Sequence, residues 1–292
     1  MKKSLLDLVE ERTVFFDGAM GTMLMARGLE SGGIPEQLNA DHPERVQEIH
    51  RLYYEAGADV VHTNTFGGSP IKLAGLGAGE RMADLNARGA RIAREVCPEG
   101  KFVAGDIGPT GKMMAPLGDV TSEQLEEAFE SQAEALLSGG ADFISIETMF
   151  SLEEALSAVE GARRAGAPLV VAAVTFQKTP KGYFTVMGDT PEKSVSEFEA
   201  AGVDVIATNC TLGSGDMIEL TSKLRGLTQK PILVQPNAGK PFSREGRTFY
   251  EQTPEEFARD CVEIRKAGAD MIGGCCGTDD RFIREIVAAV KK

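Results

Sequence analysis

Three features of the sequence together predict a (β/α)8 barrel. A short phrase of glycine, aspartate and an apolar run occurs four times, at residues 56–61, 139–144, 201–206 and 267–272. Further apolar runs bounded by turn residues lie at 14–16, 102–104, 169–174 and 232–234. The eight runs recur about every 36 residues, which is the length of a strand with its crossover helix. Eight such units close into a (β/α)8 barrel, also called a TIM barrel.

The repeated phrase marks the passage from a helix to a buried parallel strand. Residues 43–55 have a helical pattern, and the phrase after them supplies a glycine stop and a short apolar run. Three later helices have recognisable starts. Thr190 and Thr253 stand before proline and acidic residues, and Thr121 with Gln124 fits a capping box. An open, doubly wound sheet is the alternative for the same order of elements.

The composition indicates a globular protein and argues against some partners. The 292 residues are 42% hydrophobic and 26% charged, and no linker or low-complexity tract divides them, so we expect one domain over residues 1–292. The formal net charge of -13 argues against nucleic acid or an anionic membrane as partner, because phosphate contacts require a basic face. We expect the glycine-rich segment 67–79 to be a mobile lid or an ordinary surface loop.

The first residues and the cysteines favour a cytoplasmic location. Residues 1–12 mix a few apolar side chains with acidic ones, which is not the pattern of a signal peptide. No stretch of the sequence approaches the roughly 20 apolar residues of a membrane span. The 5 cysteines are an odd number in a long chain, which does not fit a disulfide scaffold. A reducing compartment is therefore expected, with some thiols used for chemistry.

Three cysteines fall at the carboxyl ends of predicted strands, where barrels carry their active sites. Cys210 follows the sixth run, Cys275 and Cys276 follow the eighth, and Asn237 ends the seventh run between them. Three thiolates with one open position describe a catalytic zinc site, and Asn237 is placed to lend an oxygen. Adjacent strand residues normally point to opposite faces. The glycines around the cysteine pair permit the sharp turn that brings the two thiols together.

Other roles remain open for these cysteines. A vicinal pair can be redox-active, and a buried cysteine often packs as a small hydrophobic side chain. Packing is the role that we expect for Cys97 and Cys261, which lie in helical segments.

Polar residues at other strand ends are candidates for binding a ligand. Asp17 and Glu147 end the first and fourth runs, where a carboxylate can hold an ammonium group, act as a base or accept backbone hydrogen bonds. Residues 18–21 offer small side chains whose backbone N–H groups can cradle a carboxylate or phosphate, or simply form a tight turn. His62 ends the second run and is a further candidate for ligand contact.

The strand-end phrases resemble the homocysteine S-methyltransferase family, in particular its cobalamin-dependent branch. The resemblance covers essentially the whole chain. Its motifs are Asp17-Gly18-Ala19-Met20-Gly21-Thr22, Asn64-Thr65-Phe66, Gly105-Asp106-Ile107-Gly108-Pro109-Thr110-Gly111, Glu147-Thr148, Asn209-Cys210, Pro236-Asn237-Ala238-Gly239-Lys240-Pro241 and Gly273-Gly274-Cys275-Cys276-Gly277-Thr278. The Asn-Cys and Gly-Gly-Cys-Cys-Gly pair is the most specific part.

The resemblance implies a (β/α)8 barrel with a zinc ion and a bound amino acid. It implies Zn2+ on three thiolates, with the homocysteine sulfur at the open position and Asn237 near the metal; the ligands are Cys210, Cys275 and Cys276. It also implies groups that hold the two ends of the amino acid: Asp17 and Glu147 for the ammonium, and the N–H groups around Gly18, Ala19 and Met20 for the carboxylate. Zinc makes the thiol available as thiolate near neutral pH, where a free thiol of pKa about 8.5 is mostly protonated.

The implied reaction is methyl transfer to homocysteine, giving methionine. The implied donor is methylcobalamin on a corrinoid protein or module, supplied in trans or by a longer chain. Relatives that use betaine or S-methylmethionine are an alternative, and the absence of Trp counts against betaine, whose quaternary ammonium is commonly held in an aromatic cage. Three further functions stay open for the same barrel: a corrinoid-linked demethylase, an aldolase-like or phosphate-binding barrel, and a zinc-storing or thiol-sensing protein.

Overall fold

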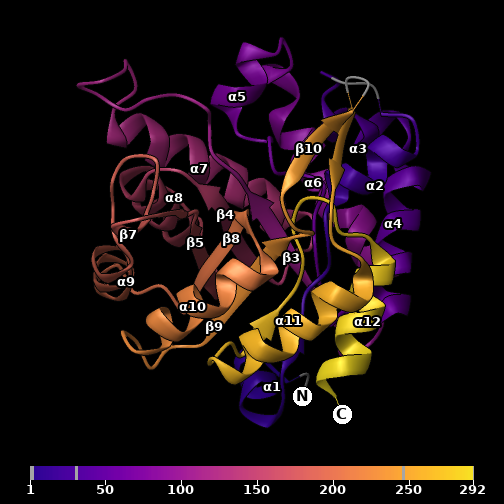
Figure 1. Cartoon of the computed structure of the whole chain (residues 1–292). Coiled ribbons are helices and arrows are strands. Elements are labelled where there is room, and N and C mark those ends of the chain that lie inside the picture. Colours follow the sequence, from indigo (N-terminus) through magenta and orange to yellow (C-terminus); the bar gives the residue numbers. More distant parts are fainter. Residues whose placement is uncertain (1–2, 30–31, 245–246, 292) are drawn as a thin grey trace.

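The predicted barrel is confirmed by the computed structural model, which describes residues 3–29, 32–244 and 247–291. All strands of the central sheet run parallel, in the order β1-β12-β9-β8-β5-β4-β3-β2, and a bridge between Phe16 and Val60 joins the two edges. Figure 1 shows the helices packed around this sheet. Each strand falls on a predicted apolar run. They are β1 (Val14–Phe15), β2 (Val60–His62), β3 (Phe102–Ile107), β4 (Phe143–Met149), β5 (Val170–Val174), β8 (Val205–Gly213), β9 (Ile232–Asn237) and β12 (Met271–Ile272).

A ring of crossover helices surrounds the sheet, with one of these helices after each strand of the central sheet as described. They are α4 (Pro43–Ala56), α6 (Met82–Val96), α7 (Ser122–Ser138), α8 (Leu152–Arg164), α9 (Pro191–Ala200), α10 (Ser214–Arg225), α11 (Pro254–Lys266) and α12 (Asp280–Val290). The predicted N-caps are confirmed at Thr121, Thr190 and Thr253, the first and last with complete capping boxes. Neighbouring helices pack in chain order, and α12 closes the ring against α4. In the described part of the chain, no helix is long and apolar enough to cross a membrane.

Alternate residues of the strands build two separate apolar layers. Inward side chains form one cluster, represented by Val60, Phe102 and Phe143 on successive strands. Their sequence neighbours, such as Val61 and Val103, belong to the cluster between the sheet and the helices. Helix α1 (Leu5–Glu11) packs Leu5 on the inner cluster and covers the end of the barrel at the bottom of Figure 1. The carboxyl ends of the strands therefore form the opposite, open end.

The aspartate of the repeated phrase ties neighbouring strands together. Asp204 accepts a hydrogen bond from the Val170 backbone N–H at 2.8 Å and pairs with Arg163 at 2.7 Å. The three other copies repeat this arrangement. They pair Asp59 with Phe15 N–H and Arg12, Asp142 with Val103 N–H and Arg94, and Asp270 with Ile232 N–H and Arg225. The repeat thus stabilises the fold at the amino ends of the strands, away from the open end.

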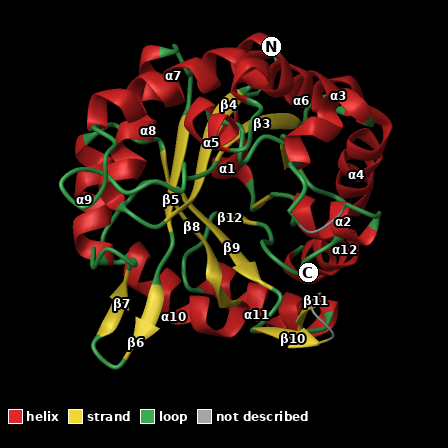
Figure 2. Cartoon of the chain, turned by 90° about the horizontal axis from the view of Figure 1, so that it is seen from above, coloured by secondary structure: helices red, strands yellow, loops and turns green. Residues whose placement is uncertain are grey.

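The connections after the strands carry extra elements that shape the open end. Short helices lie after the first two strands: α2 (Met20–Ala26), η1 (Pro35–Gln37), α3 (Leu38–Asp41), α5 (Pro70–Gly75) and η2 (Gly79–Arg81). Segment 67–79 is therefore partly helical, because Ser69 caps α5 and Pro70 begins it. Two hairpins project from the barrel in Figure 2. They are β6 (Gln177–Thr179) with β7 (Gly182–Phe184), and β10 (Pro241–Arg244) with β11 (Arg247–Tyr250).

Candidate functional site

Three cysteine sulfurs lie together at the open end of the barrel. The Sγ atoms of Cys210, Cys275 and Cys276 are all within 4.8 Å of one another, and Cys210 and Cys276 are 3.9 Å apart. Two sulfurs bound to one tetrahedral zinc ion at about 2.3 Å lie roughly 3.8 Å apart. These three thiols are free and half-buried. The predicted cluster therefore exists in a geometry that could hold a metal ion.

The backbone around the thiols departs from regular strand geometry. The pairing of β8 with β9 shifts between Asn209 and Gly213, and Cys210 and Thr211 have φ of 59° and 61°. Side chains other than glycine seldom adopt this left-handed region, and such strain is common at functional sites. The irregular end of β8 brings Cys210 to the two sulfurs in the turn after β12, on the far side of β9, although Asn209 takes the inward position of the strand.

The glycines around Cys275 and Cys276 act mainly through their small size. The strand β12 ends at Ile272, so the two cysteines lie in a turn. A Cβ on Gly274 would come within 2.5 Å of Thr278 Oγ1, and one on Gly277 within 2.3 Å of Tyr250 Cγ. Of these glycines, Gly277 alone has a positive φ, of 86°. This refines the prediction that glycine permits the adjacent thiols to converge. Most of these glycines are required because a Cβ would not fit, and only Gly277 also adopts a backbone conformation that favours glycine.

The three thiols share protons rather than ionising independently. Contacts with Cys210 and Cys275 lower the pKa of Cys276 to about 3. The pKa of Cys275 is raised well above that of a free thiol, because its proton is engaged by the other two sulfurs in a buried position. Three negative charges this close together require a cation. Without a cation, the cluster thus carries about one thiolate. A bound positive ion would allow the other thiols to ionise as well.

Asn209 connects the thiols to the half-buried carboxylate of Glu147. Its Nδ2 lies 3.9 Å from the Cys275 sulfur and donates a 2.9 Å hydrogen bond to Glu147 Oε2. Its Oδ1 accepts the Thr148 backbone N–H at 2.8 Å, which fixes the amide. On the neighbouring strand, the Oδ1 atom of Asn237 is buried and has no hydrogen-bond partner among the described residues. A polar atom in that state is suited to an absent ligand or metal.

Asp17 and His62 form a buried pair next to this carboxylate. Asp17 accepts hydrogen bonds at 2.8 Å from both the backbone N–H and the Nδ1 of His62. The other ring nitrogen of His62 lies 3.1 Å from Ser145 Oγ. A carboxylate has about four acceptor positions, so Asp17 keeps capacity for a further donor.

Burial and close charges shift the pKa values in this layer. Burial raises the pKa of Glu147 to about 7. Burial followed by the Glu147 charge also raises the pKa of Asp106, which ends β3. Burial opposes a charge on His62, but the adjacent Asp17 carboxylate raises its pKa to about 10. The upper layer of the barrel interior is therefore acidic, with one histidine whose pKa is raised, whereas the layer below it is apolar.

The segment 18–20 passes beside the thiol-bearing turn. The Ala19 N–H donates to Thr278 Oγ1 at 3.2 Å, and Thr278 in turn donates to the Cys275 carbonyl at 2.7 Å. Helix α2 begins at Met20 with Ala19 as its N-cap, and no side chain caps it. The structure therefore has an extended segment that leads into α2 at this place, and not a tight turn; this segment stands next to the thiols.

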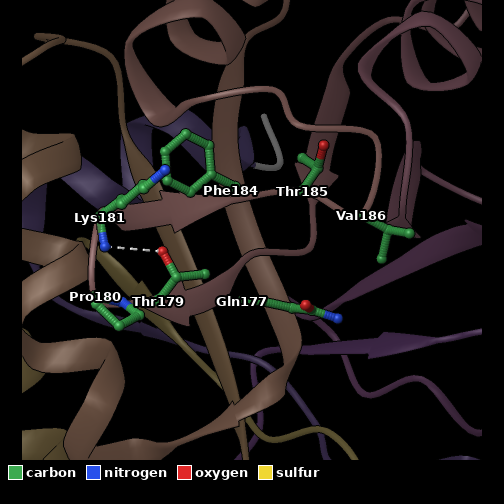
Figure 3. A pocket seen from close by; sticks show the side chains of 7 residues that line it. All are labelled: Gln177, Thr179, Pro180, Lys181, Phe184, Thr185 and Val186. Carbon is green, nitrogen blue, oxygen red and sulfur yellow. Dashed lines mark hydrogen bonds between the residues drawn. The ribbon is translucent and has the colours of Figure 1, made fainter.

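The remaining cysteines and the surface hollow lie apart from this cluster. Cys261 is fully buried in α11, and Cys97, the C-cap of α6, packs against the main apolar cluster. Both positions agree with the predicted packing roles. A hollow of about 490 Å³ lies at the β6–β7 hairpin. Figure 3 shows the side chains that line it. Its lining comes from residues 177–186 alone, and none of the clustered thiols or carboxylates contributes to it.

Several residues of the site were not predicted from the sequence. The amide of Asn209 was seen only as part of a motif, yet it bridges thiol and carboxylate. Asp106 is one of many polar residues that follow the apolar runs, so the sequence does not single it out. No sequence pattern indicates that Tyr250 belongs to the site. Tyr250 reaches the site because the β10–β11 hairpin folds its ring onto Gly277. Alternation along β3 places Asp106 on the inner face with Ala104, and this was the available clue.

A (β/α)8 barrel with a sulfur cluster and buried carboxylates at the carboxyl ends of its strands has the organisation of a barrel enzyme with a candidate metal centre. The homocysteine S-methyltransferase family matches residues 14–290, and the chain belongs to this family. It is 37% identical over 98% of its length to methionine synthase of Mycobacterium tuberculosis, and 35% identical over 99% to that of Mycobacterium leprae. It spans 25% of the length of each.

A solved structure shares the fold over nearly the whole chain. The metallated form of the homocysteine methyltransferase MmuM from Escherichia coli superposes with a TM-score of 0.81 at 25% sequence identity. The match covers 97% of this chain and 99% of that one. The family resemblance expected from the strand-end motifs is thereby confirmed.

Proposed function

We propose that this chain is a zinc-dependent S-methyltransferase that converts homocysteine to methionine, with methylcobalamin on a corrinoid protein or module as the methyl donor. The observation that carries the proposal is the juxtaposition of the sulfur cluster with Glu147 through the single amide of Asn209. Homocysteine has a sulfur at one end and an ammonium at the other, separated by three carbon atoms. The three thiols match the sulfur end of homocysteine, and the Glu147 carboxylate matches its ammonium end.

The residues present fit a zinc ion. Cys210, Cys275 and Cys276 would hold it, since their spacing suits tetrahedral sulfur ligation and thiolates are preferred zinc ligands. The unpartnered Oδ1 of Asn237 would approach the remaining position when substrate is absent. When bound, Zn2+ supplies a positive charge that keeps thiols, including the substrate's, deprotonated near neutral pH.

The protein groups around the cluster would position the amino acid. Asp17 and Glu147 would accept the ammonium, and the N–H groups around Gly18, Ala19 and Met20 would receive the carboxylate. His62 holds Asp17 by two hydrogen bonds, so the carboxylate has a fixed direction before the ligand arrives. The apolar layer beneath excludes water, which strengthens each of these charge interactions.

The proposed donor requires a second protein or module at the open end. The curated relatives named methionine synthase are about four times as long as this chain, which leaves room in them for further modules. The large exposed apolar side chains of the present chain lie predominantly in the connections around the open end. A protein-borne methyl donor would need such a surface.

Zinc content tests the proposal directly. We expect about one zinc per chain in the reduced wild type, and loss of that zinc in Cys210→Ala and in Cys276→Ala. Cys97→Ala is the matched control, because Cys97 lies outside the cluster and its variant should keep the metal. Addition of homocysteine should shift the zinc X-ray absorption edge towards four sulfur ligands.

Activity with defined donors tests the rest of the proposal. Methionine should form from homocysteine with a methylcobalamin-loaded carrier, and not with betaine or S-methylmethionine. Reduced wild type that remains free of zinc after reconstitution would refute the metal centre. Homocysteine binding without methyl transfer from any of these donors would instead favour a storage or sensing protein.

A further inference from the structure

Asp106 carries a buried carboxylate that the described protein leaves without a partner. Asp106 lies in β3, and strand alternation places its side chain on the inner face of the barrel, as for Ala104. The residue is 4% exposed. The Asp106 backbone is fully used, because Thr63 Oγ1 accepts from its N–H and Thr65 Oγ1 donates to its carbonyl. Within the described residues, however, its Oδ1 atom has no hydrogen-bond partner. An ionised carboxylate in this state is costly unless a cation comes to it.

The neighbours of Asp106 are already engaged with one another. Ser145 is paired directly opposite on β4, and it bonds to His62. His62 is held on its other side by Asp17, and Glu147 is held by Asn209. Each of these side chains thus has a partner within the protein, and Asp106 is the exception among them. Among these side chains, Asp106 is therefore the one that is free to accept a hydrogen bond from a ligand.

The charge of this layer of side chains indicates the chemistry of such a ligand. Three carboxylates share it with one imidazolium, and like charges so close together cannot all remain ionised without a further cation. Consistently, burial and the Glu147 charge raise the pKa of Asp106. A ligand with a positively charged nitrogen donor would balance the charge and supply the hydrogen bond. A neutral or anionic ligand would do neither.

We propose that Asp106 is a third carboxylate of the ammonium subsite and the residue that makes the site select thiols bearing an α-amino group. This inference rests on the proposed function, since homocysteine supplies the ammonium. It adds a contact at the end of β3 to those proposed for Asp17 and Glu147. Asp106 binds the ammonium and takes no part in transfer of the methyl group.

Asp106→Asn in the zinc-loaded protein tests the inference. The substitution keeps the shape of the side chain and removes its charge. Titration calorimetry should show homocysteine binding about 30-fold more weakly than to the wild type. Binding of 4-sulfanylbutanoate, which lacks the amino group, should change less than about threefold on the same grounds. The preference for the amino thiol would then collapse in the variant.

Thr65→Val is the matched control, because it removes the hydroxyl that donates to the Asp106 carbonyl without changing a charge or a contact of Asp17, His62 or Glu147. It should affect both thiols equally. Equal weakening of both thiols by Asp106→Asn would assign Asp106 a structural role, and unchanged homocysteine affinity would also overturn the inference. A melting temperature of the ligand-free Asp106→Asn protein at or above that of the wild type is expected, because the substitution replaces a buried carboxyl group whose Oδ1 atom has no hydrogen-bond partner in the described structure.

A second variant protects the test against misfolding. Asp106→Ser removes the charge with a smaller side chain, and it should show the same selective loss of homocysteine. The wild type supplies the baseline for both variants. A wild type that binds neither thiol would refute the proposed function itself, whereas wild-type binding with unselective variants would refute only the role of Asp106.

Discussion

At the scale of single residues, the barrel interior has to balance several buried charges. The pair of Asp17 and His62 accounts for part of that balance, since the histidine is held on one side by the carboxylate and on the other by Ser145. The pair is buried, with Asp17 1% and His62 7% exposed. His62 therefore fixes the direction of the Asp17 carboxylate by two hydrogen bonds.

The stability due to this pair should depend on pH in a defined direction. The pKa of His62 is raised from 6.5 to about 10 in the folded protein. A raised pKa means that the stabilisation is complete below pH 6.5 and is lost as the pH rises through 10. His62→Gln should therefore lower the free energy of unfolding by about 3 kcal/mol at pH 6. Denaturant unfolding across the pH range should show this difference from wild type shrinking towards pH 10.

His50 provides the contrasting control. It is fully buried in α4, where burial lowers its pKa to about 3 and leaves both ring nitrogens without a partner in the described structure. A lowered histidine pKa costs stability as the pH falls below 6.5. The difference between wild type and His50→Gln should therefore change below pH 6.5, and that for His62→Gln above it. A pH-independent difference for His62→Gln would show that the ring stays neutral.

At the scale of elements, the sulfur cluster depends on two irregular strand ends. The bulge after Asn209 directs Cys210, and the turn after β12 is fixed on both flanks. Cys275 N–H donates to the Pro236 carbonyl at 2.7 Å, and Gly277 N–H donates to Thr22 Oγ1 at 3.0 Å. The hairpin β10–β11 places Tyr250 over the same turn. The Pro236 carbonyl, the Thr22 hydroxyl and the β10–β11 hairpin thus hold the turn that carries Cys275 and Cys276.

Gly277→Ala should disturb this element in two ways. The residue has φ of +86°, and a Cβ would meet the Tyr250 ring at 2.3 Å. We expect a loss of about 3 kcal/mol of stability from strain and overpacking together. Zinc affinity should fall about tenfold, because groups that orient metal ligands have effects of this size. Competition with a chromogenic chelator measures the affinity, and thermal unfolding measures the stability.

Gly202→Ala separates the two effects. Gly202 has φ of +73° with nothing within 4 Å of the added Cβ, so only the conformational strain of about 1 kcal/mol should appear. Its zinc affinity should equal that of the wild type. Equal zinc affinity in both alanine variants would show that the Tyr250 contact does not position the thiols.

These elements also show which structural features can be predicted from the sequence. The eight strands were predictable because buried parallel strands are short apolar runs, and the repeated Gly-x-Asp phrase marks several of them. The β6–β7 hairpin was missed because Gln177, Lys178 and Thr179 are exposed, so no alternation distinguishes the strand. The convergence of three thiols followed from strand order. The positive φ of Cys210 and the lack of a partner for Asp106 depend on tertiary contacts that have no local pattern.

At the scale of the whole molecule, exposed apolar side chains are concentrated at one end. Among the described residues, every large exposed hydrophobic side chain except Leu227 lies in a connection that follows a strand. The members of this apolar rim are Met25, Leu76, Met113, Leu117, Phe150, Val186, Met187, Phe242 and Phe249. The opposite end is covered by α1 and by the charged pairs of the repeat. Such a separation is typical of a surface that receives a partner.

The rim should contribute to use of a protein-borne methyl donor. Met113 and Leu117 are 52% and 68% exposed in the connection after β3, outside the thiol and carboxylate clusters. Replacing both with serine should raise the KM for a methylcobalamin-loaded carrier about tenfold, since contacts of this kind contribute one or two kcal/mol at an interface. Zinc content, homocysteine affinity and the rate with free methylcobalamin should stay unchanged. Leu227→Ser, at 37% exposure on the other end, is the control and should leave every one of these quantities unaltered. An equal loss with carrier and with free methylcobalamin would place the effect in the catalytic site and remove the argument for docking at the rim.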